Sequence, residues 1–286
     1  EHKIDFVALI SVTNANGNGD PLSGNRPRTD YNGMGEISTV CIKRKIRNRM
    51  QDMGNLIFVQ SEDRRDHDDK FGSLSERAAA ATDWIKETGI TGKELYAETA
   101  CKKWMDVRSF GQVFAFKSGN DNDDGVSVGV RGPVSVHQAI SISPVRIEEM
   151  QITKSVNGEP GKKRSSDTMG TKCFVRFGLY KIKGAINVQL AEKTGFSQED
   201  AAVVKECLRT LFVNDASAAR PEGSMEVVKL FWWEHNCKEG QYSSAKVHRS
   251  VHVTPKNPEG IPTCVNDYEI TLDELPGLVP EIIDGV

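Results

Sequence analysis

The first residues in this sequence that could do chemistry lie in a loop rich in amides and glycine. Residues 14–20 read NANGNGD, which resembles a calcium-binding loop at first sight. Such a loop needs an acidic ligand at its twelfth position, and Asn25 stands there. A dinucleotide-binding motif needs a third glycine at a fixed offset from Gly17 and Gly19, and Leu22 stands there instead. Two interpretations remain: a loop whose exposed amides bind phosphate or sugar, and a mobile surface loop.

Cationic side chains follow the amide loop. Arg26 and Arg28 lie in the run NRPRTD, and Lys43, Arg44 and Arg47 lie on or beside one flank of the next predicted helix. Cations gathered at one groove bind nucleic-acid phosphates and hold the backbone without reading the bases. A solvated helix face would have the same composition, so the residue types leave both interpretations open.

A second cationic group lies in the polar run 157–170, which contains Lys162, Lys163 and Arg164 and is followed by Lys172. The Asn-Gly pair at 157–158 is a turn signal, so the run predicts a hairpin with these cations at its tip. Such a tip is either simply solvated or a finger that reaches a nucleic acid or a neighbouring subunit. Composition does not separate the two.

The sequence offers few catalytic or metal-binding groups. The charged run around His67 contains a His-Asp doublet but reads as a solvated segment, and His248 and His252 lie in a strand-like segment that lacks a third ligand. No nucleophile elbow occurs, which leaves Asp20 and Asp30 as the only candidate catalytic carboxylates. Carboxylates beside arginines are more often ion-paired than catalytic. We therefore predict no metal site and no cofactor.

Composition indicates a chain without a membrane segment. The 286 residues are 38% hydrophobic and 27% charged, and the longest apolar runs are too short to span a bilayer. The six cysteines form no CxxC pair and no secretory signal is seen, which is typical of a reduced, cytoplasmic protein. The net charge of −3 argues against nucleic-acid binding, but it is uneven, since residues 255–286 carry −6 and the remainder carries +3.

These residues must be positioned by a mixture of strands and helices. Hydrophobic periodicity predicts the order strand, helix, helical insert, two strands, hairpin, strand, helix, strand. We expect these elements at 2–12, 36–53, 74–86, 92–105, 107–116, 134–142, 145–153, 173–182, 197–213 and 225–233. Without its inserts the order is compatible with a βαββαβ ferredoxin-like core, which is also the RRM arrangement. The predicted class is α+β, and the region after 233 reads as irregular.

Several motifs together resemble the backbone subunit of the CRISPR type I-C Cascade complex, a member of the RAMP superfamily. The strand 6–12 followed by TNANGNGDPLSGNRPRTD resembles the family's opening. DVRSFG at 106–111, RGPV at 131–134 leading to SIS at 141–143, and NDASAARPEG at 214–223 before the strand LFWWEH agree with it. The resemblance covers nearly the whole chain.

The resemblance implies a hand-like, non-catalytic RNA-binding subunit. Its RRM-like palm would comprise residues 1–60, 106–147 and 173–254, with helical fingers at 61–105, a long hairpin thumb at 148–172 and an acidic end at 255–286. Copies would stack head to tail along a guide RNA beside other Cascade subunits. Each thumb would flip out one guide base and leave the others for pairing with target DNA.

The same resemblance implies a set of RNA-contacting residues. Met169 would be the apolar wedge of the thumb, and Arg108 and Ser109 would lie at a strand edge. The full set is Asn14, Asn25, Arg26, Arg28, Lys43, Arg44, Arg47, Arg108, Ser109, Lys163, Arg164, Met169, Lys172 and Arg220. Two alternatives remain: a RAMP-family endoribonuclease that cuts guide-paired RNA through Asp20 or Asp30, and an RRM-like protein outside CRISPR systems.

Overall fold

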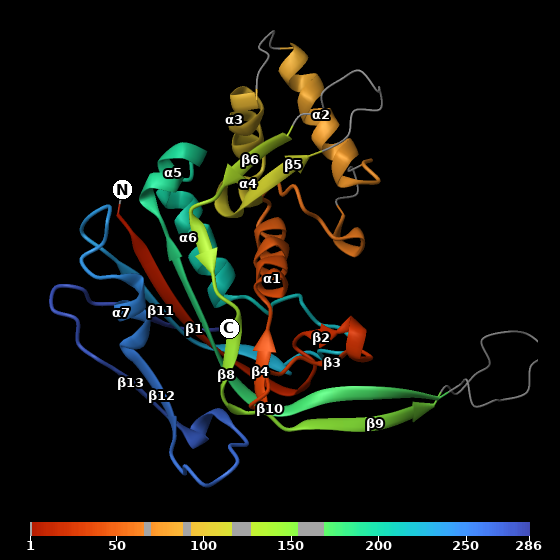
Figure 1. Ribbon diagram of the computed structural model, residues 1–286, viewed down its shortest axis with the longest axis vertical. Helices are drawn as coiled ribbons and strands as arrows, with labels where there is room; N and C mark the ends of the chain where they lie inside the picture. Colours follow the sequence, from red (N-terminus) through yellow and green to blue (C-terminus); the bar gives the residue numbers. More distant parts are fainter. Residues whose placement is uncertain (1, 66–69, 88–92, 116–126, 154–168) are drawn as a thin grey trace, which may run out of the picture.

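One large antiparallel sheet forms the centre of the fold (Figure 1). The computed structural model describes residues 2–65, 70–87, 93–115, 127–153 and 169–286. The strands lie in the order β14-β11-β1-β10-β8-β4, and β7 and β9 also pair with β10. Their bounds are β1 Ile4–Ala15, β4 Met34–Ile37, β7 Val134–Val136, β8 Ala139–Pro144, β9 Ile147–Thr153, β10 Met169–Ile186, β11 Met225–Glu234 and β14 Glu281–Asp284.

Strand β1 lies in the middle of this sheet and is buried on both faces. It pairs with β10 on one side and with β11 on the other. Phe6 and Ile10 belong to one hydrophobic cluster, whereas Val7 and Leu9 belong to a second cluster on the opposite face. A strand covered on both faces is a continuous apolar run rather than an alternating one, which explains the composition of VALISV.

Helices cover one face of the sheet. They are α1 Thr39–Asp52, α5 Val188–Thr194 and α6 Gln198–Arg209. The predicted stripe of α1 is confirmed for Ile42, Ile46 and Met50, which are buried, whereas Met53 lies just past the helix and is partly exposed. Helix α6 begins at the predicted capping box of Ser197 and Asp200. Helix α1 therefore carries its cations along a face that is fixed by core packing.

The C-terminal region covers the other face of the sheet. It contains regular elements, although the sequence predicted an irregular region. Its elements are α7 Ser244–Arg249, β12 Val251–Pro255, β13 Tyr268–Leu272 and the edge strand β14. Val247 and Leu278 pack with Trp233 in the second cluster. The many prolines of this region interrupt its hydrophobic periodicity, so the sequence pattern did not indicate these short strands.

A separate helical unit lies beyond the end of α1 (Figure 1). It comprises α2 Leu74–Glu87, α3 Lys93–Lys103, α4 Met105–Phe110, and the hairpin of β5 Gly111–Ala115 with β6 Ser127–Arg131. Phe58 packs against Trp104 and Phe114, with ring centroids 4.8 Å and 5.1 Å away.

The strand predicted at 107–116 is wrong in its first half. The helix ends at Gly111, whose φ is +78° and where a Cβ would lie 2.3 Å from the Val130 carbonyl oxygen.

A long hairpin of β9 and β10 projects from the sheet (Figure 1). Met169 pairs with Thr153, and pairing continues to Val175 opposite Ile147. The predicted α+β class is confirmed at the level of a mixed α/β fold, and the structure adds the large antiparallel sheet at its centre. In the part of the chain that the structure describes, no helix has the length and apolar character that a membrane-spanning helix needs.

Candidate nucleic-acid interface

The amide loop after β1 is held together by its own side chains. Asn16 Nδ2 donates to the Asn25 carbonyl at 2.6 Å, and Asn18 Oδ1 accepts from the Ser38 backbone N–H at 2.8 Å. Asn14 and Asn25 adopt left-handed backbone conformations, with φ of 51° and 60°, which asparagine tolerates better than most residues. Part of the asparagine content therefore builds the loop, and the backbone presents Arg26 and Arg28 in a defined place.

The two candidate catalytic carboxylates are also engaged inside this loop. Asp20 accepts from Leu22 N at 3.2 Å and from Ser23 Oγ at 3.0 Å. Arg28 Nη2 lies 3.3 Å from the same carboxylate, which confirms that Asp20 is an arginine partner. Asp30 instead accepts the backbone N–H groups of Asn32 and Met34 at 2.8 Å and 2.9 Å. Among the described residues no arginine pairs with Asp30, so that half of the expectation is wrong.

A second loop, residues 214–223, lies against α1 through an ion-pair network. Asp215 pairs with Lys45, which is almost fully buried, and with Arg220 Nε at 3.2 Å. Burial lowers the pKa of Lys45, and the charge of Asp215 opposes that effect. Asn16 N donates to the Ala219 carbonyl at 2.9 Å. This loop therefore locks the amide loop to α1, with Arg220 holding an internal partner.

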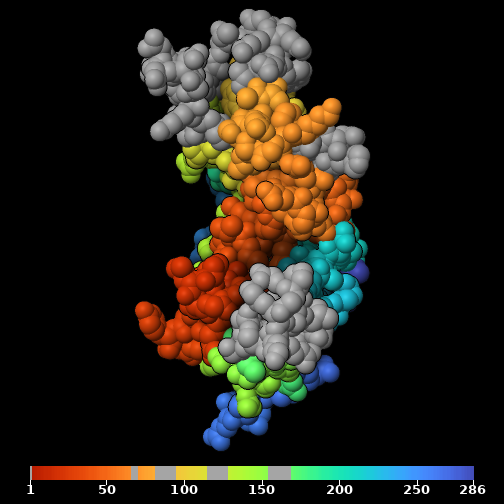
Figure 2. Space-filling model, turned by 90° about the vertical axis from the view of Figure 1, so that its right-hand side faces the viewer, coloured from red at the N-terminus to blue at the C-terminus, as the bar shows by residue number. Residues whose placement is uncertain are grey.

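The base of the hairpin joins both loops. Lys172 Nζ donates to the Ala218 carbonyl at 3.0 Å, and Arg26 pairs with Glu149 of β9. Arg176 Nη1 donates to Asn14 Oδ1 at 3.0 Å. Figure 2 shows N-terminal residues, in red, and residues of the cyan part of the colour bar on opposite sides of the same face.

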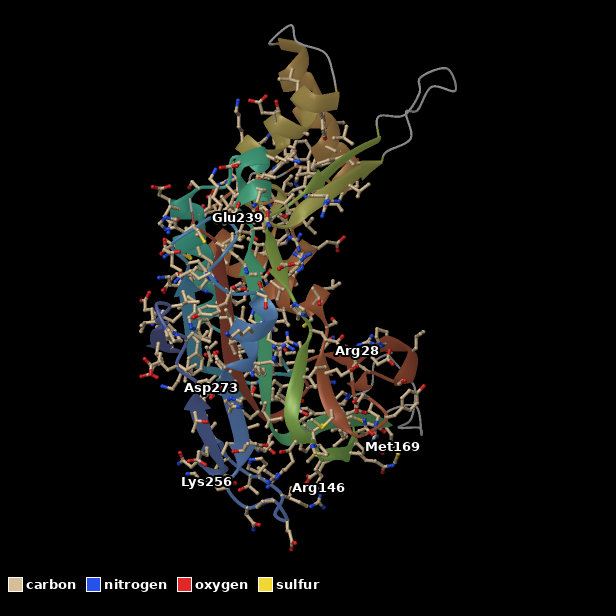
Figure 3. All side chains as sticks on the ribbon, turned by 60° about the vertical axis from the view of Figure 1, so that its left-hand side comes forward. Arg28, Arg146, Met169, Glu239, Lys256 and Asp273 are labelled. Carbon is tan, nitrogen blue, oxygen red and sulfur yellow. The ribbon has the colours of Figure 1, made fainter. Side chains whose placement is uncertain are left out.

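Two arginines at this base were missed by sequence reasoning. Arg146 and Arg176 line a cavity of about 550 Å³ together with Asn14, Ser143 and other residues. Arg176 is exposed between the buried residues Val175 and Phe177, so strand alternation was the one signal that could have found it. Figure 3 shows Arg28, Met169 and Arg146 toward the same end of the molecule.

The three α1 cations of the predicted RNA-contacting set, Lys43, Arg44 and Arg47, face the helical unit and the segment before it rather than the amide loop. Arg47 Nε donates to the buried Asp106 at 2.9 Å, and Arg44 Nη1 donates to the Val59 carbonyl at 2.8 Å. Lys43 Nζ lies 5.1 Å from the centre of the Phe110 ring. Burial and then the charge of Arg47 lower the pKa of Lys43. Among the described residues, Arg47 is ion-paired, Arg44 binds a backbone carbonyl, and Lys43 makes neither contact.

The structure does not bring Arg108 and Ser109 into this surface. Both lie in helix α4, not at a strand edge. Arg108 makes two bonds to Asp200, of 2.9 Å and 2.7 Å, and the Ser109 side chain is fully buried. An RNA contact by Ser109 would require this segment to open, so its expected position is corrected.

The hairpin separates two residues that were expected to act together. Met169 pairs with Thr153 and Lys172 pairs with Met150. Side chains alternate between the faces of a strand, so Met169 and Lys172 point to opposite faces. Met169 is 61% exposed. Lys163 and Arg164 fall at 154–168, outside the described residues.

No metal centre is found within the described ranges, where no three His, Cys, Asp or Glu side chains are arranged to hold an ion. His248 Nε2 donates to the Gly184 carbonyl of β10 at 2.9 Å, whereas His252 Nε2 contacts the Asp273 carboxylate at 2.7 Å. The first lies in α7 and the second in β12, so the expected common strand face is wrong. The run 66–69 lies outside the described residues.

Comparisons with known proteins agree on one family. A family model described as CRISPR-associated protein Cas7 matches residues 2–273. A curated CRISPR-associated protein Cas7 from Haloferax volcanii is 24% identical over 304 residues, which cover 100% of this chain and 85% of that protein.

Two solved structures are similar to this chain. A chain of a CRISPR RNA-guided surveillance complex in a pre-nicking state has a TM-score of 0.48 and 14% identity, covering 86% of this chain and 81% of that one. A chain of a CRISPR RNA-guided surveillance complex has a TM-score of 0.42 and 17% identity, covering 87% and 74%.

Proposed function

This chain belongs to the CRISPR-associated protein Cas7 family, and we propose that it is a non-catalytic backbone subunit of a type I-C Cascade surveillance complex. In this function it holds the phosphate backbone of a guide RNA and leaves the guide bases available for pairing with target DNA. Copies bind head to tail along the guide beside other Cascade subunits, in the cytoplasm.

The observation that carries this proposal is the joining of three cation-bearing segments at the hairpin base. The amide loop presents Arg26 and Arg28, and the hairpin presents Lys172 and Arg176. The 214–223 loop links the two, because its carbonyls at 219 and 218 accept from the backbone N–H of residue 16 and from Lys172 Nζ. Cations fixed by rigid loops suit a phosphate backbone of constant spacing, since little conformational entropy is lost on binding. Asn14, Asn25 and Lys43 also belong to the proposed contact set.

The arrangement of elements supports a palm, a thumb and fingers. Helix α1 follows β1, α6 precedes β11, and the strand order β11-β1-β10-β8 fits a βαββαβ core. We assign this core as an RRM-like palm, the β9–β10 hairpin as the thumb and residues 61–105 as the fingers. Met169 on the thumb is proposed to contact a guide base, and Lys163 and Arg164 to approach the RNA from its tip.

The endoribonuclease alternative has less support. Asp20 already binds Leu22 N, Ser23 Oγ and Arg28, and Asp30 binds two backbone N–H groups. A carboxylate that acts on RNA must be accessible to a metal ion or a substrate hydroxyl. Incubating the purified complex with guide-complementary RNA and a divalent metal should leave the RNA intact. Cuts at regular intervals that disappear in Asp20→Ala or Asp30→Ala would overturn the non-catalytic assignment.

One experiment tests the assembly directly. The chain is purified from its host, and native mass spectrometry measures the mass and RNA content of the material that co-purifies. We expect several copies bound to one RNA of defined length. A monomer that carries short, heterogeneous RNA would indicate an RRM-like protein outside CRISPR systems. RNA-free material that ignores added guide RNA would exclude an RNA-binding function.

A further inference from the structure

A second cationic surface lies away from the hairpin base. A cavity of about 750 Å³ is formed between β8, β10, α7 and β12. Its charged lining residues include Lys181, Lys183 and Arg249. Figure 3 shows α7 and β12, in blue, on one side of β8, while Arg28 and Met169 lie on the other side. The cavity shares no lining residue with the cavity of Arg146 and Arg176 at the hairpin base.

The two lysines face this cavity because of strand alternation. Tyr180 and Ile182 of β10 belong to the core under α1 and α6, so Lys181 and Lys183 project from the opposite face. Lys181 Nζ donates to the Val251 carbonyl at 2.6 Å, which holds its ammonium at the cavity wall. Among the described residues, neither Lys183 nor Arg249 makes an ion pair. The cationic groups of Lys183 and Arg249 therefore line the cavity without an ion-pair partner among the described residues.

The carboxylates that contact the histidines of the cavity lining are already engaged. Asp273 is engaged by His252 at 2.7 Å. Asp5 is fully buried behind His248, with 3.6 Å between Oδ1 and Nε2, and it also contacts His235 at 2.8 Å. Burial, and then the charge of Lys183, lower the pKa of Lys181 to about 8. Like charges gathered without an acidic partner favour an anionic ligand.

The rim of the cavity adds aromatic surface. His137 and His252 line it and are exposed, and the ring of His137 packs edge-on against His248 at 6.1 Å between centroids. Unstacked nucleic-acid bases stack on imidazole rings as they do on other aromatic side chains. A carboxylate-bearing peptide would satisfy the cations but would make no use of these rings, so the lining favours a nucleotide.

We propose that this cavity binds one nucleotide unit of a single-stranded nucleic acid, with its phosphate at Lys183 and Arg249 and its base against His137. The strand is a second one, bound in addition to the RNA in the groove at the hairpin base. A polynucleotide, a mononucleotide and inorganic phosphate all carry the phosphate group that these cations would bind. Of the three, the ligand is the polynucleotide.

The test measures binding of a fluorescent oligodeoxythymidylate to the full chain already saturated with guide RNA. The double variant Lys183→Ala/Arg249→Ala should weaken binding roughly tenfold or more. It should also reduce the salt slope of log K by about 0.7, since the two cations share one phosphate and each phosphate neutralised on a single strand contributes about 0.7. The charge-matched control Lys205→Ala/Arg209→Ala, on α6 at the other face of the sheet, should bind like the wild type. Thermal melting of each variant verifies folding.

The base contact is tested separately. His137→Ala should lose roughly tenfold in affinity for the oligonucleotide, and His137→Phe should retain it. Thymidine monophosphate and inorganic phosphate should compete weakly. Competition by either that equals the oligonucleotide would overturn the assignment to a polynucleotide.

Three other outcomes would overturn the proposal. Unchanged oligonucleotide affinity in Lys183→Ala/Arg249→Ala would remove the cavity from nucleic-acid binding. An equal loss of guide RNA affinity in this variant would show that the cavity is part of the guide RNA site. Displacement of the oligonucleotide by polyglutamate at equal concentration would indicate an acidic protein segment as the partner. Loss of guide RNA binding only in variants at the hairpin base would test the proposed function and would leave the assignment of this cavity unchanged.

Discussion

Arg47 Nε donates to Asp106 Oδ2 at 2.9 Å, although the two residues are 59 positions apart in the chain. Asp106 is fully buried and also accepts the backbone N–H groups of Phe58 and Val59 at 2.6 Å and 3.1 Å. One carboxylate therefore ties α1, the 57–59 segment and α4 together. The pair connects the helical unit to the sheet and gives Arg47 a structural role.

We expect Arg47→Ala to lower the free energy of unfolding by about 3 kcal/mol, because it leaves a buried carboxylate without its counter-charge. Urea unfolding followed by tryptophan fluorescence measures this change. Arg209→Ala is the matched control, since Arg209 pairs with Glu206 on a solvated helix face, and such a pair contributes less than about 1 kcal/mol. Equal, small effects of both variants would contradict the structural role of Arg47.

Sequence reasoning found features that depend on local spacing. The stripe of Ile42, Ile46 and Met50 and the capping box of Ser197 and Asp200 were predicted correctly, since helical periodicity and capping are set by neighbours within a few residues. Long-range pairings were not found. The residue types of Arg47 and Asp106 do not indicate that the two side chains meet. In a sequence, an arginine that binds phosphate looks the same as an arginine that pairs with a carboxylate.

The same limit explains the candidate site. The amide loop and the hairpin base were located, but Arg108 was placed beside RNA while it binds Asp200. Arg176 was not selected, and its contact with Asn14 is set by the register of β1 with β10. Register is decided by sheet packing across the whole chain. Cations on strand faces were therefore undervalued relative to cations in loops.

Arg28 and Lys43 are expected to contribute to RNA binding without supporting the fold. Arg28 is 39% exposed at its side chain beside Asp20, and Lys43 has no ion pair among the described residues. Arg28→Ala and Lys43→Ala should each weaken guide RNA binding across sequences and reduce the salt slope of log K by about 0.7. Fluorescence anisotropy at several salt concentrations measures both. Unchanged affinity and slope in either variant, with Arg209→Ala as control, would remove that residue from the RNA site.

The stability of the chain should fall in mild acid because of His248. Burial is the main cause that lowers the pKa of His248 from its ordinary value of 6.5, while the Gly184 carbonyl and Asp5 oppose it. The unfolded chain therefore takes up a proton near pH 6.5 that the folded chain refuses until lower pH. The stabilising contribution is complete above 6.5 and is lost as the pH falls toward the folded pKa.

Urea unfolding between about pH 7 and pH 5 measures this loss. His248→Gln should reduce stability at neutral pH but flatten its pH dependence, because glutamine does not titrate. His252→Gln is the control, since His252 is exposed beside Asp273. A slope in His248→Gln as steep as that of the wild type would show that other groups cause the pH dependence.

Met169 is expected to act on RNA without stabilising the fold. Its side chain is 61% exposed near the end of the described hairpin, so Met169→Ser should change the free energy of unfolding by less than about 0.5 kcal/mol. If Met169 contacts a guide base, the variant should lose periodic protection of the guide in chemical footprinting of the assembled complex. Met150→Ser is the matched control, because Met150 is similarly exposed and pairs with Lys172 on the opposite face of the hairpin. A footprint altered by Met150→Ser and preserved in Met169→Ser would place the RNA-facing side of the hairpin on the other face.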